Sequence, residues 1–192
     1  MKTHEHARFA GVCDSSSLRI LKTMITTRDA TLDDLPAIVD IYNESIPAGT
    51  ATADTKPITV ESRLQWFAQF SPEKRPIWVA EDEARQIVGC IYVTSFYAGR
   101  PAYDKTAEVS LYLSNSHQKQ GLGTFLLQKM IDACPALGIT TLVGMHFDHN
   151  EGTRHLNEKF GFEVCGHLPE IAEVQGQKRG LLISLLRIPA AE

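Results

Sequence analysis

The chain has 192 residues and a mass of 21.3 kDa, which suits one domain with a sizeable buried core. Lysine and arginine number 19 and aspartate and glutamate 23, so the formal net charge is −4, without the overall basic charge of a general nucleic-acid-binding protein. Hydrophobic residues make up 43% and charged residues 22%, the balance of an ordinary globular protein. No stretch approaches the roughly 20 apolar residues that span a bilayer.

The cysteines are widely spaced and form neither a C-x-x-C pair nor a dense disulfide framework; they are Cys13, Cys90, Cys134 and Cys165. Scattered cysteines in a chain of this length are typical of a reducing compartment, so we expect a cytoplasmic protein with free thiols. The last three are expected in apolar surroundings, where a thiol behaves as a small hydrophobic group.

Residues 1–23 contain no continuous apolar run of about 7–15 residues, so they are not typical of a secretory signal. We interpret them as a loosely ordered extension, followed by a single domain over residues 24–192. Met24 directly precedes a β-branched segment, and we hypothesise that it is the true or an alternative initiation site.

The first part of the domain predicts a short strand at 25–28 followed by two helices. Thr31 and Asp34 have the spacing of a capping box, and the apolar residues after them recur at helical spacing as far as Ile46. A loop rich in threonine and alanine follows. The second helix is expected over 59–70, and its inward side chains are expected to be Leu64, Phe67 and Ala68.

The middle of the chain predicts three strands, at 77–81, 86–96 and 108–113, and Gly89 inside the second indicates a β-bulge or a close contact. The remainder predicts a helix, a strand, a helix and two strands, at 121–133, 140–145, 151–160, 162–167 and 181–188. The inward face of the first of these helices is expected to comprise Leu122, Phe125, Leu126 and Met130. This order predicts a mixed sheet covered by helices in a single α/β (α+β) domain.

The stretch from Glu108 to Thr124 carries the most chemical information, because a strand runs into a glycine-containing turn that opens a helix. Backbone N–H groups in the first helical turn lack partners inside the helix, and the helix dipole adds partial positive charge. Such a place binds anions, phosphates above all, and Gly121 and Gly123 let a ligand approach the backbone closely. The stretch contains neither a Walker loop nor a G-x-G-x-x-G dinucleotide fingerprint.

The spacing Gln118-x-x-Gly121-x-Gly123 after a strand resembles the acetyl-coenzyme A signature of the GNAT N-acetyltransferases. Further segments resemble the phosphinothricin and methionine sulfoximine N-acetyltransferases of that family, in the same order and over about residues 25–188; they are 40–43, 100–114 and 150–162. The resemblance implies the GNAT fold, a mixed and mostly antiparallel sheet of about six to seven strands with about four helices and splayed central strands.

The resemblance also implies acetyl-CoA as co-substrate, no metal, and roles for particular residues. The splayed strand would pair its backbone with the pantetheine arm and steady the oxyanion, the turn would bind the pyrophosphate, and Asn150 and Thr153 would lie near the pantetheine or thiol end. From the residues alone, Asn150 is equally the N-cap of the next helix. The coenzyme-binding residues implied are Leu111, Tyr112, Leu113, Gln118, Lys119, Gln120, Gly121, Leu122, Gly123, Thr124, Asn150 and Thr153.

An amine must lose a proton before it attacks a thioester, and by the resemblance Glu108 is the candidate catalytic base, with a pKa raised by partial desolvation. Arg100 is the candidate clamp for an acceptor carboxylate, since guanidinium matches carboxylate in a two-bond fork. The acceptor-binding candidates are Arg100, Pro101, Ala102, Tyr103 and Asn43. The alternatives are an exposed strand glutamate, a solvated loop arginine and a core tyrosine.

The chain departs from the family pattern on the last helix, where many members carry a tyrosine or histidine and this chain has Asn157, which cannot act as an acid. Thiolate departure would then rely on water or another group, or occur without a proton. In the last strand, Leu181 and Ile183 replace a tryptophan and an aspartate, and Ala53-Asp54 replaces an aromatic residue.

By the resemblance, the expected acceptor is the α-amino group of a small amino acid or analogue such as methionine sulfoximine, methionine sulfone or phosphinothricin, attacked directly in a ternary complex. A homodimer is implied, with no nucleic-acid or membrane partner. The alternatives are acetylation of a protein N-terminus or lysine, acetylation of a polyamine or aminoglycoside, and an acyl-CoA sensor without turnover. His146, Asp148 and His149 could suggest a metal site, but only the first two share a face, so a loop is favoured.

Overall fold

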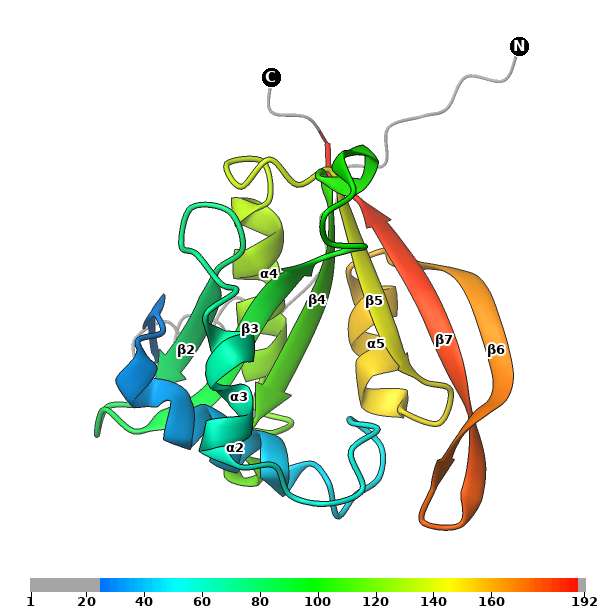
Figure 1. Ribbon diagram of the computed structural model, residues 1–192, viewed down its shortest axis with the longest axis horizontal. Coiled ribbons are helices and arrows are strands. Elements are labelled where there is room, and N and C mark those ends of the chain that lie inside the picture. Colours follow the sequence, from blue (N-terminus) through cyan, green and yellow to red (C-terminus); the bar gives the residue numbers. More distant parts are fainter. Residues whose placement is uncertain (1–24, 190–192) are drawn as a thin grey trace.

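The computed structural model describes residues 25–189, so Cys13, the extension at 1–23 and Met24 lie outside the described residues. Seven strands form one sheet in the order β1-β2-β3-β4-β5-β7-β6 (Figure 1). Neighbouring strands pair antiparallel except for β4 and β5, which are parallel. The strands are β1 (Thr26–Asp29), β2 (Ile77–Glu81), β3 (Ile87–Ser95), β4 (Thr106–Leu113), β5 (Thr141–Phe147), β6 (Glu163–Val174) and β7 (Gln177–Arg187).

Helices cover both faces of this sheet, with α2 and α3 on one face and α4 and α5 on the other (Figure 1). The α-helices of the described residues are α2 (Leu35–Glu44), α3 (Val60–Phe67), α4 (Leu122–Ala133) and α5 (Glu151–Lys159). Short 3₁₀ turns are η1 (Leu32–Asp34), η2 (Pro101–Tyr103) and η3 (Asn115–His117). The predicted capping box is present, because Thr31 and Asp34 exchange backbone and side-chain contacts before α2.

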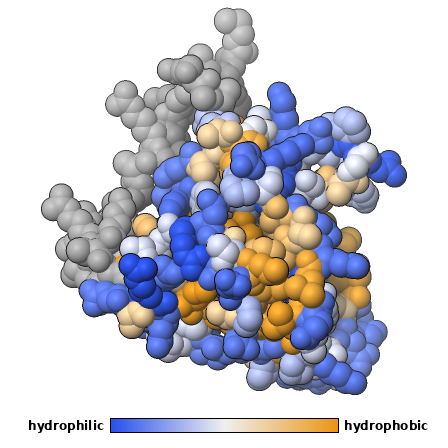
Figure 2. Space-filling view, turned by 60° about the vertical axis from the view of Figure 1, so that its left-hand side comes forward, coloured by the Kyte–Doolittle hydropathy of each residue, from blue (hydrophilic) through white to orange (hydrophobic). Residues whose placement is uncertain are grey.

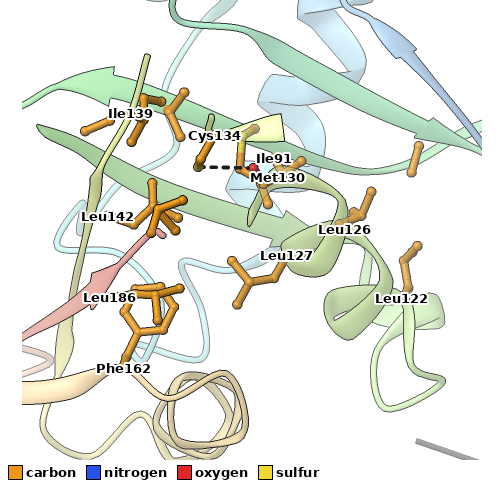
Figure 3. Packing of buried hydrophobic residues seen from close by; sticks show 14 of the residues in the cluster. Ile91, Leu122, Leu126, Leu127, Met130, Cys134, Ile139, Leu142, Phe162 and Leu186 are labelled. Carbon is orange, nitrogen blue, oxygen red and sulfur yellow. Dashed lines mark hydrogen bonds between the residues drawn. The ribbon is translucent and has the colours of Figure 1, made fainter. Parts of the chain in front are cut away.

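The main hydrophobic core lies between α4 and the sheet. Leu126 and Met130 of α4 are fully buried and belong to one cluster with Ile91 of β3 and Leu142 of β5 (Figure 3). The inward face of α4 is therefore the predicted one, and truncation of such a leucine to alanine typically costs about 2–5 kcal/mol. The core fixes the position of α4 and, with it, of the turn that precedes this helix.

The central strands β4 and β5 splay apart and leave a space between them. β4 pairs with β5 only from Thr106↔Thr141 to Glu108↔Val143, although β4 continues to Leu113 and stays paired with β3. β5 also continues and stays paired with β7. The two strands diverge beyond Glu108 and Val143 (Figure 1), and we call the space between them the fork.

The sequence prediction underestimated the last two strands. β6 and β7 form a hairpin paired as far as Val174↔Gln177, whereas strands were expected only at 162–167 and 181–188. Its turn is Gln175-Gly176, and both residues have positive φ, as two-residue hairpin turns of type I′ require. Most of β6 is exposed, so it lacks the apolar alternation from which a strand is predicted.

Several predicted side-chain positions also need correction. Leu64 and Ala68 were expected inside, but Leu64 is 44% exposed and Ala68 is exposed, while Trp66 packs with Phe67 against the sheet. Cys165 was expected in apolar surroundings and is exposed on β6.

The prediction at Gly89 is confirmed. A Cβ there would lie 2.7 Å from Leu113 Cδ2 and 3.2 Å from the Tyr112 carbonyl oxygen, and the β2–β3 register shifts between Ala80 and Glu81, opposite this glycine. The strand expected at 140–145 extends to Phe147, so His146 lies within β5 and not in a loop.

The surface combines charged residues with a few apolar areas. Figure 2, in which the left-hand side of Figure 1 comes forward, shows hydrophobic side chains gathered in one area with hydrophilic ones around it. Among residues 25–189, no helix is long and apolar enough to cross a membrane.

Candidate active site

The turn before α4 has the backbone geometry of an anion-binding site. Lys119 and Gly121 have φ of +59° and +88°, and Gly121 is the N-cap of α4. Left-handed residues of this kind turn successive N–H groups toward one side and form a concave nest. The N–H groups of the first helical turn, from Leu122 to Thr124, add to this nest, because a helix offers them no internal partner.

The side chains of this turn mostly brace the backbone. Gln118 Nε2 donates to Asn115 Oδ1 at 3.0 Å, and Gln120 Nε2 donates to the Ser116 carbonyl at 2.8 Å. Leu122 points into the core with 1% exposure, so only its backbone can meet a ligand. The residues predicted here therefore act chiefly through their main chain.

A cleft of about 350 Å³ runs from this turn along the end of β4 to α5. It brings together all the predicted coenzyme-binding residues except Gln120 and Leu122, namely Leu111, Tyr112, Leu113, Gln118, Lys119, Gly121, Gly123, Thr124, Asn150 and Thr153. The loop after α2 contributes lining residues that the sequence did not predict, Ser45, Thr50 and Ala51. A long ligand with an anionic end fits such a cleft, and the open edge of β4 offers it unpaired backbone groups.

The fork holds a second cavity of about 100 Å³. It shares Leu111, Tyr112, Asn150 and Thr153 with the larger cleft, so the two adjoin. Its further lining comes from β4, β5 and α5 and includes Ser110, Gly144, His146 and Asn157. The cleft therefore leads from an anion-binding turn to a polar pocket between the splayed strands.

Asn150 joins two segments at the edge of this cleft. Its Oδ1 accepts the Thr153 N–H at 3.0 Å, which confirms the predicted N-cap of α5. Its Nδ2 donates to the Thr50 carbonyl at 3.0 Å and so ties the loop after α2 to α5. The residue positions both walls of the cleft whether or not it also touches a ligand.

Glu108 stands where the fork begins, in the last β4–β5 pair, opposite Thr94 of β3 on its other side. Its neighbours Ala107 and Val109 belong to the core under α4, so strand alternation turns Glu108 toward the face of α2 and α3. The side chain is half-buried, and burial raises the pKa of its carboxyl above the ordinary 4.5. Glu108 thus faces away from Leu111 and Leu113, and it lines neither the cleft nor the fork cavity.

On the Glu108 face, an aromatic pocket lies under α2 and α3. Tyr42 contacts Tyr112 with ring centroids 4.8 Å apart, and the Arg63 guanidinium lies over Tyr42 at 5.1 Å and over Trp66 at 5.7 Å. Asp54 accepts the Tyr42 O–H at 2.6 Å and pairs with Arg63 at 3.2 Å. The sequence identified position 54 as unusual, but no periodic signal indicated Arg63, which lies on a helix with little buried surface.

The predicted acceptor-binding residues do not lie together in one cavity, unlike most of the predicted coenzyme-binding residues. Asn43 exchanges two hydrogen bonds with the backbone of Ile58, at 3.0 and 2.9 Å, so its amide holds the loop before α3. Arg100 lies 6.0 Å from the Tyr97 ring on the β3–β4 loop, where Tyr97 stacks on Tyr103. Pro101, Ala102 and Tyr103 are exposed in η2, and among the described residues these four loop residues line none of the cavities above.

Thiol and metal chemistry find little support in the described residues. Burial raises the pKa of both the Cys90 and the Cys134 thiols to about 12, which leaves almost no thiolate at neutral pH. No group of three or more histidine, cysteine, aspartate or glutamate residues within 25–189 is placed to hold a metal ion.

Comparison with known proteins identifies the family. Residues 35–162 match the family model described as the acetyltransferase (GNAT) family. The chain is 44% identical over 159 residues to the Bacillus subtilis protein named "Putative phosphinothricin acetyltransferase YwnH", covering 83% of this chain and 96% of that relative. It is 32% identical to the L-methionine sulfoximine/L-methionine sulfone acetyltransferase of Pseudomonas aeruginosa, covering 82% of this chain and 89% of that protein.

A solved structure of a GNAT acetyltransferase has a similar fold. The GNAT superfamily phosphinothricin acetyltransferase from Sinorhizobium meliloti, crystallised in complex with AcCoA, superposes with a TM-score of 0.80 at 27% identity, over 86% of this chain and 89% of that one. The fold and the cleft thus define a coenzyme-dependent acyltransferase. The chain belongs to the GNAT family of acetyltransferases. It is an acetyl-CoA-dependent N-acetyltransferase with the expected fold and co-substrate.

Proposed function

We propose that this enzyme acetylates the α-amino group of a small amino acid or analogue, with methionine sulfoximine, methionine sulfone and phosphinothricin as the leading acceptors. The relatives named for these activities cover most of the chain and support this choice. In the proposed reaction the amine attacks the thioester directly in a ternary complex, and Glu108 accepts the proton that the amine loses.

The observation that carries the proposal is the two-sided fork. Acetyl-CoA would lie in the cleft on the α4 and α5 side, with its pyrophosphate at the nest around Lys119 and Gly121 and its acyl end toward the fork. The acceptor would approach from the α2 and α3 side, where Glu108 lies with a raised pKa. Backbone donors of β4 would then steady the developing oxyanion.

Direct attack is also supported by the state of the thiols. A covalent acyl-enzyme route needs a cysteine thiolate at the fork, and the nearest thiol to the aromatic pocket is Cys90. Because burial holds the pKa of Cys90 at about 12, this thiol is a poor nucleophile at neutral pH.

Arg100 is the proposed clamp for the acceptor carboxylate. The loop that carries it leaves β3 after Ser95, which pairs with Ala107, the residue before Glu108. The guanidinium is therefore attached at the same end of β4 as the proposed base. Replacement of Arg100 by alanine is expected to raise the KM for amino-acid acceptors more than it lowers kcat, because the clamp holds the acceptor in ground and transition state alike.

The test is a thiol-release assay with acetyl-CoA and a panel of acceptors. The panel contains methionine sulfoximine, methionine sulfone, phosphinothricin, common amino acids, spermidine and a peptide with a free N-terminus. We expect the highest kcat/KM with the sulfoximine, the sulfone or phosphinothricin. Turnover of the peptide or the polyamine with no turnover of any amino acid or analogue would overturn the proposal.

We also propose that the enzyme is a homodimer. β6 exposes Val164, Leu168 and Ile171, and apolar side chains of this kind on a hairpin are typical of a surface that a partner covers. Light scattering coupled to size-exclusion chromatography should give about twice the chain mass, and a single-chain mass would contradict the proposal.

A further inference from the structure

Three buried polar atoms without a hydrogen-bond partner belong to residues on β5, α5 and β7 around Gly144, and two of these residues, His146 and Asn157, line the fork cavity. They belong to His146 Nε2, Asn157 Nδ2 and Ser184 Oγ, and these residues are 7%, 7% and 1% exposed. Gly144 brings them together, since it pairs with Ser184 across β5 and β7, and a Cβ on it would lie 3.1 Å from Asn157 Nδ2. Because buried polar atoms in proteins are nearly always paired, a ligand atom is the expected partner.

His146 has a defined tautomer in this position. Its Nδ1 lies 2.9 Å from the Phe147 carbonyl oxygen, and a carbonyl only accepts, so Nδ1 carries a hydrogen. Nε2 is then a bare lone pair in the neutral ring and an N–H donor in the imidazolium. The residue lines the fork cavity together with Asn157.

His146 also lies on the side of the sheet opposite Glu108. Leu142 belongs to the core under α4, and strand alternation places Gly144 and His146 on that same face. The proposed base, Glu108, thus faces the side from which the acceptor would approach, and His146 faces the side of the coenzyme cleft. The position that carries an acid in many relatives holds Asn157, whose amide can donate a hydrogen bond but not a proton.

We propose that His146 gives its Nε2 proton to the coenzyme sulfur when the C–S bond breaks. This inference rests on the proposed function, in which the acyl end of acetyl-CoA lies in the fork. The amine nitrogen forms a bond to the acyl carbon, the C–S bond breaks, and the electron pair of that bond goes to sulfur. The amine's surplus proton goes to Glu108 and the imidazolium proton goes to sulfur, so the product is a thiol and His146 is left neutral until solvent protonates it. Asn157 positions the sulfur by hydrogen bonding.

Among the described residues that line the fork cavity, His146 carries the only imidazole. The residues of α5 that line it, Asn150, Thr153 and Asn157, are uncharged, and on β7 its pairing partner is Leu182. β4 contributes Tyr112, whose pKa burial raises well above its usual range.

The nearest carboxylate along β5 is Asp148, two residues on. Asp148 Oδ2 lies 3.3 Å from His167 Nε2, within hydrogen-bond distance, and Asp148 Oδ1 lies 3.6 Å from His149 Nδ1.

The first test needs no turnover. NMR spectra of the imidazole Cε1–H groups are recorded with coenzyme A and with desulfo-coenzyme A, which lacks the sulfur, and the His146 signal is assigned by its loss in His146→Gln. We expect both ligands to bind and the His146 signal to shift more with coenzyme A. Equal responses to the two ligands would overturn the proposal.

The second test is kinetic. In the wild type, kcat should fall toward alkaline pH, because only the imidazolium carries the Nε2 proton. His146→Gln keeps a donor amide of similar reach, and it should lower kcat by about 10²-fold or more and remove this alkaline fall, while the KM for acetyl-CoA changes little. The control is His155→Gln on the exposed side of α5. An unchanged pH profile in His146→Gln would refute the proposal, whereas failure of the wild type with every acceptor would refute the proposed function instead.

Discussion

Replacement of Glu108 by glutamine tests the proposed base with little change in shape. The side chain stays half-buried at the start of the fork, but it can no longer accept a proton. General-base catalysis contributes about 10²–10⁴-fold, so kcat/KM should fall by that factor, equivalent to about 2.7–5.4 kcal/mol of transition-state stabilisation. Affinity for acetyl-CoA should change little, because Glu108 lines neither the cleft nor the fork cavity.

The pH dependence gives a sharper signature. Burial raises the pKa of Glu108 above 4.5 in the folded enzyme, and a base works only when deprotonated, so wild-type kcat/KM should rise with pH through that raised pKa. Glu108→Gln should lack this rise. Steady-state rates with a fixed acceptor between pH 5 and pH 9 measure it, and Glu83→Gln in the exposed β2–β3 turn controls for the loss of a charge.

Stability separates a catalytic from a structural role. A carboxyl whose folded pKa is raised binds more protons in the folded state, so its charge costs stability as pH rises through that pKa. Glu108→Gln removes this cost, and its melting temperature at pH 7 should equal or exceed that of the wild type. A variant that is as active as the wild type, or that loses activity only because it unfolds, would refute the assignment.

Three further predictions concern stability and the coenzyme site. Arg28 lowers the pKa of Asp34 from 3.8 to about 2 through two short hydrogen bonds. Asp34→Asn should therefore lower the free energy of unfolding in urea at pH 7 by about 1–2 kcal/mol, a value discounted for solvent screening. This difference between variant and wild type should vanish as pH falls from about 4 to about 2. Gly121→Ala forces a side chain into φ +88°, so calorimetry should give about five- to tenfold weaker acetyl-CoA binding. Asn43→Ala leaves two Ile58 backbone groups without partners and should cost about 1–3 kcal/mol of unfolding free energy without a comparable rise in acceptor KM.

The turn before α4 could be predicted from the sequence because its signal is local. A strand, two glycines and a helix start between Glu108 and Thr124 predict an anion-binding turn, and all residues of this turn from Gln118 to Thr124 except Gln120 and Leu122 line the cleft. Asn150 was predicted for the same reason, since an N-cap is a property of a few neighbouring residues. Local backbone geometry is what a sequence pattern encodes most directly.

The acceptor side could not be predicted to the same depth, because it depends on contacts between distant segments. The Asp54–Arg63–Tyr42 arrangement joins a loop and two helices, and the hydrogen bonds of Asn43 join α2 to the backbone of Ile58. The prediction for Leu64 failed similarly, because α3 shields the sheet with Trp66 and Phe67 and leaves its other face in solvent. Which face of a short helix is buried depends on tertiary packing.

The fork would keep the two proposed proton transfers, at Glu108 and at His146, on separate faces of the sheet. Beyond the point where they separate, β4 stays paired with β3, whereas β5 stays paired with β7 and approaches α5 at Gly144. The unpaired backbone of β4 beyond Glu108 requires hydrogen-bond partners, and an extended ligand that enters the gap supplies them. Strand alternation then places the Glu108 carboxylate on one face of the sheet and the His146 imidazole on the other. The separation of the proposed acid from the proposed base therefore depends on the single parallel pair in the sheet, β4 and β5.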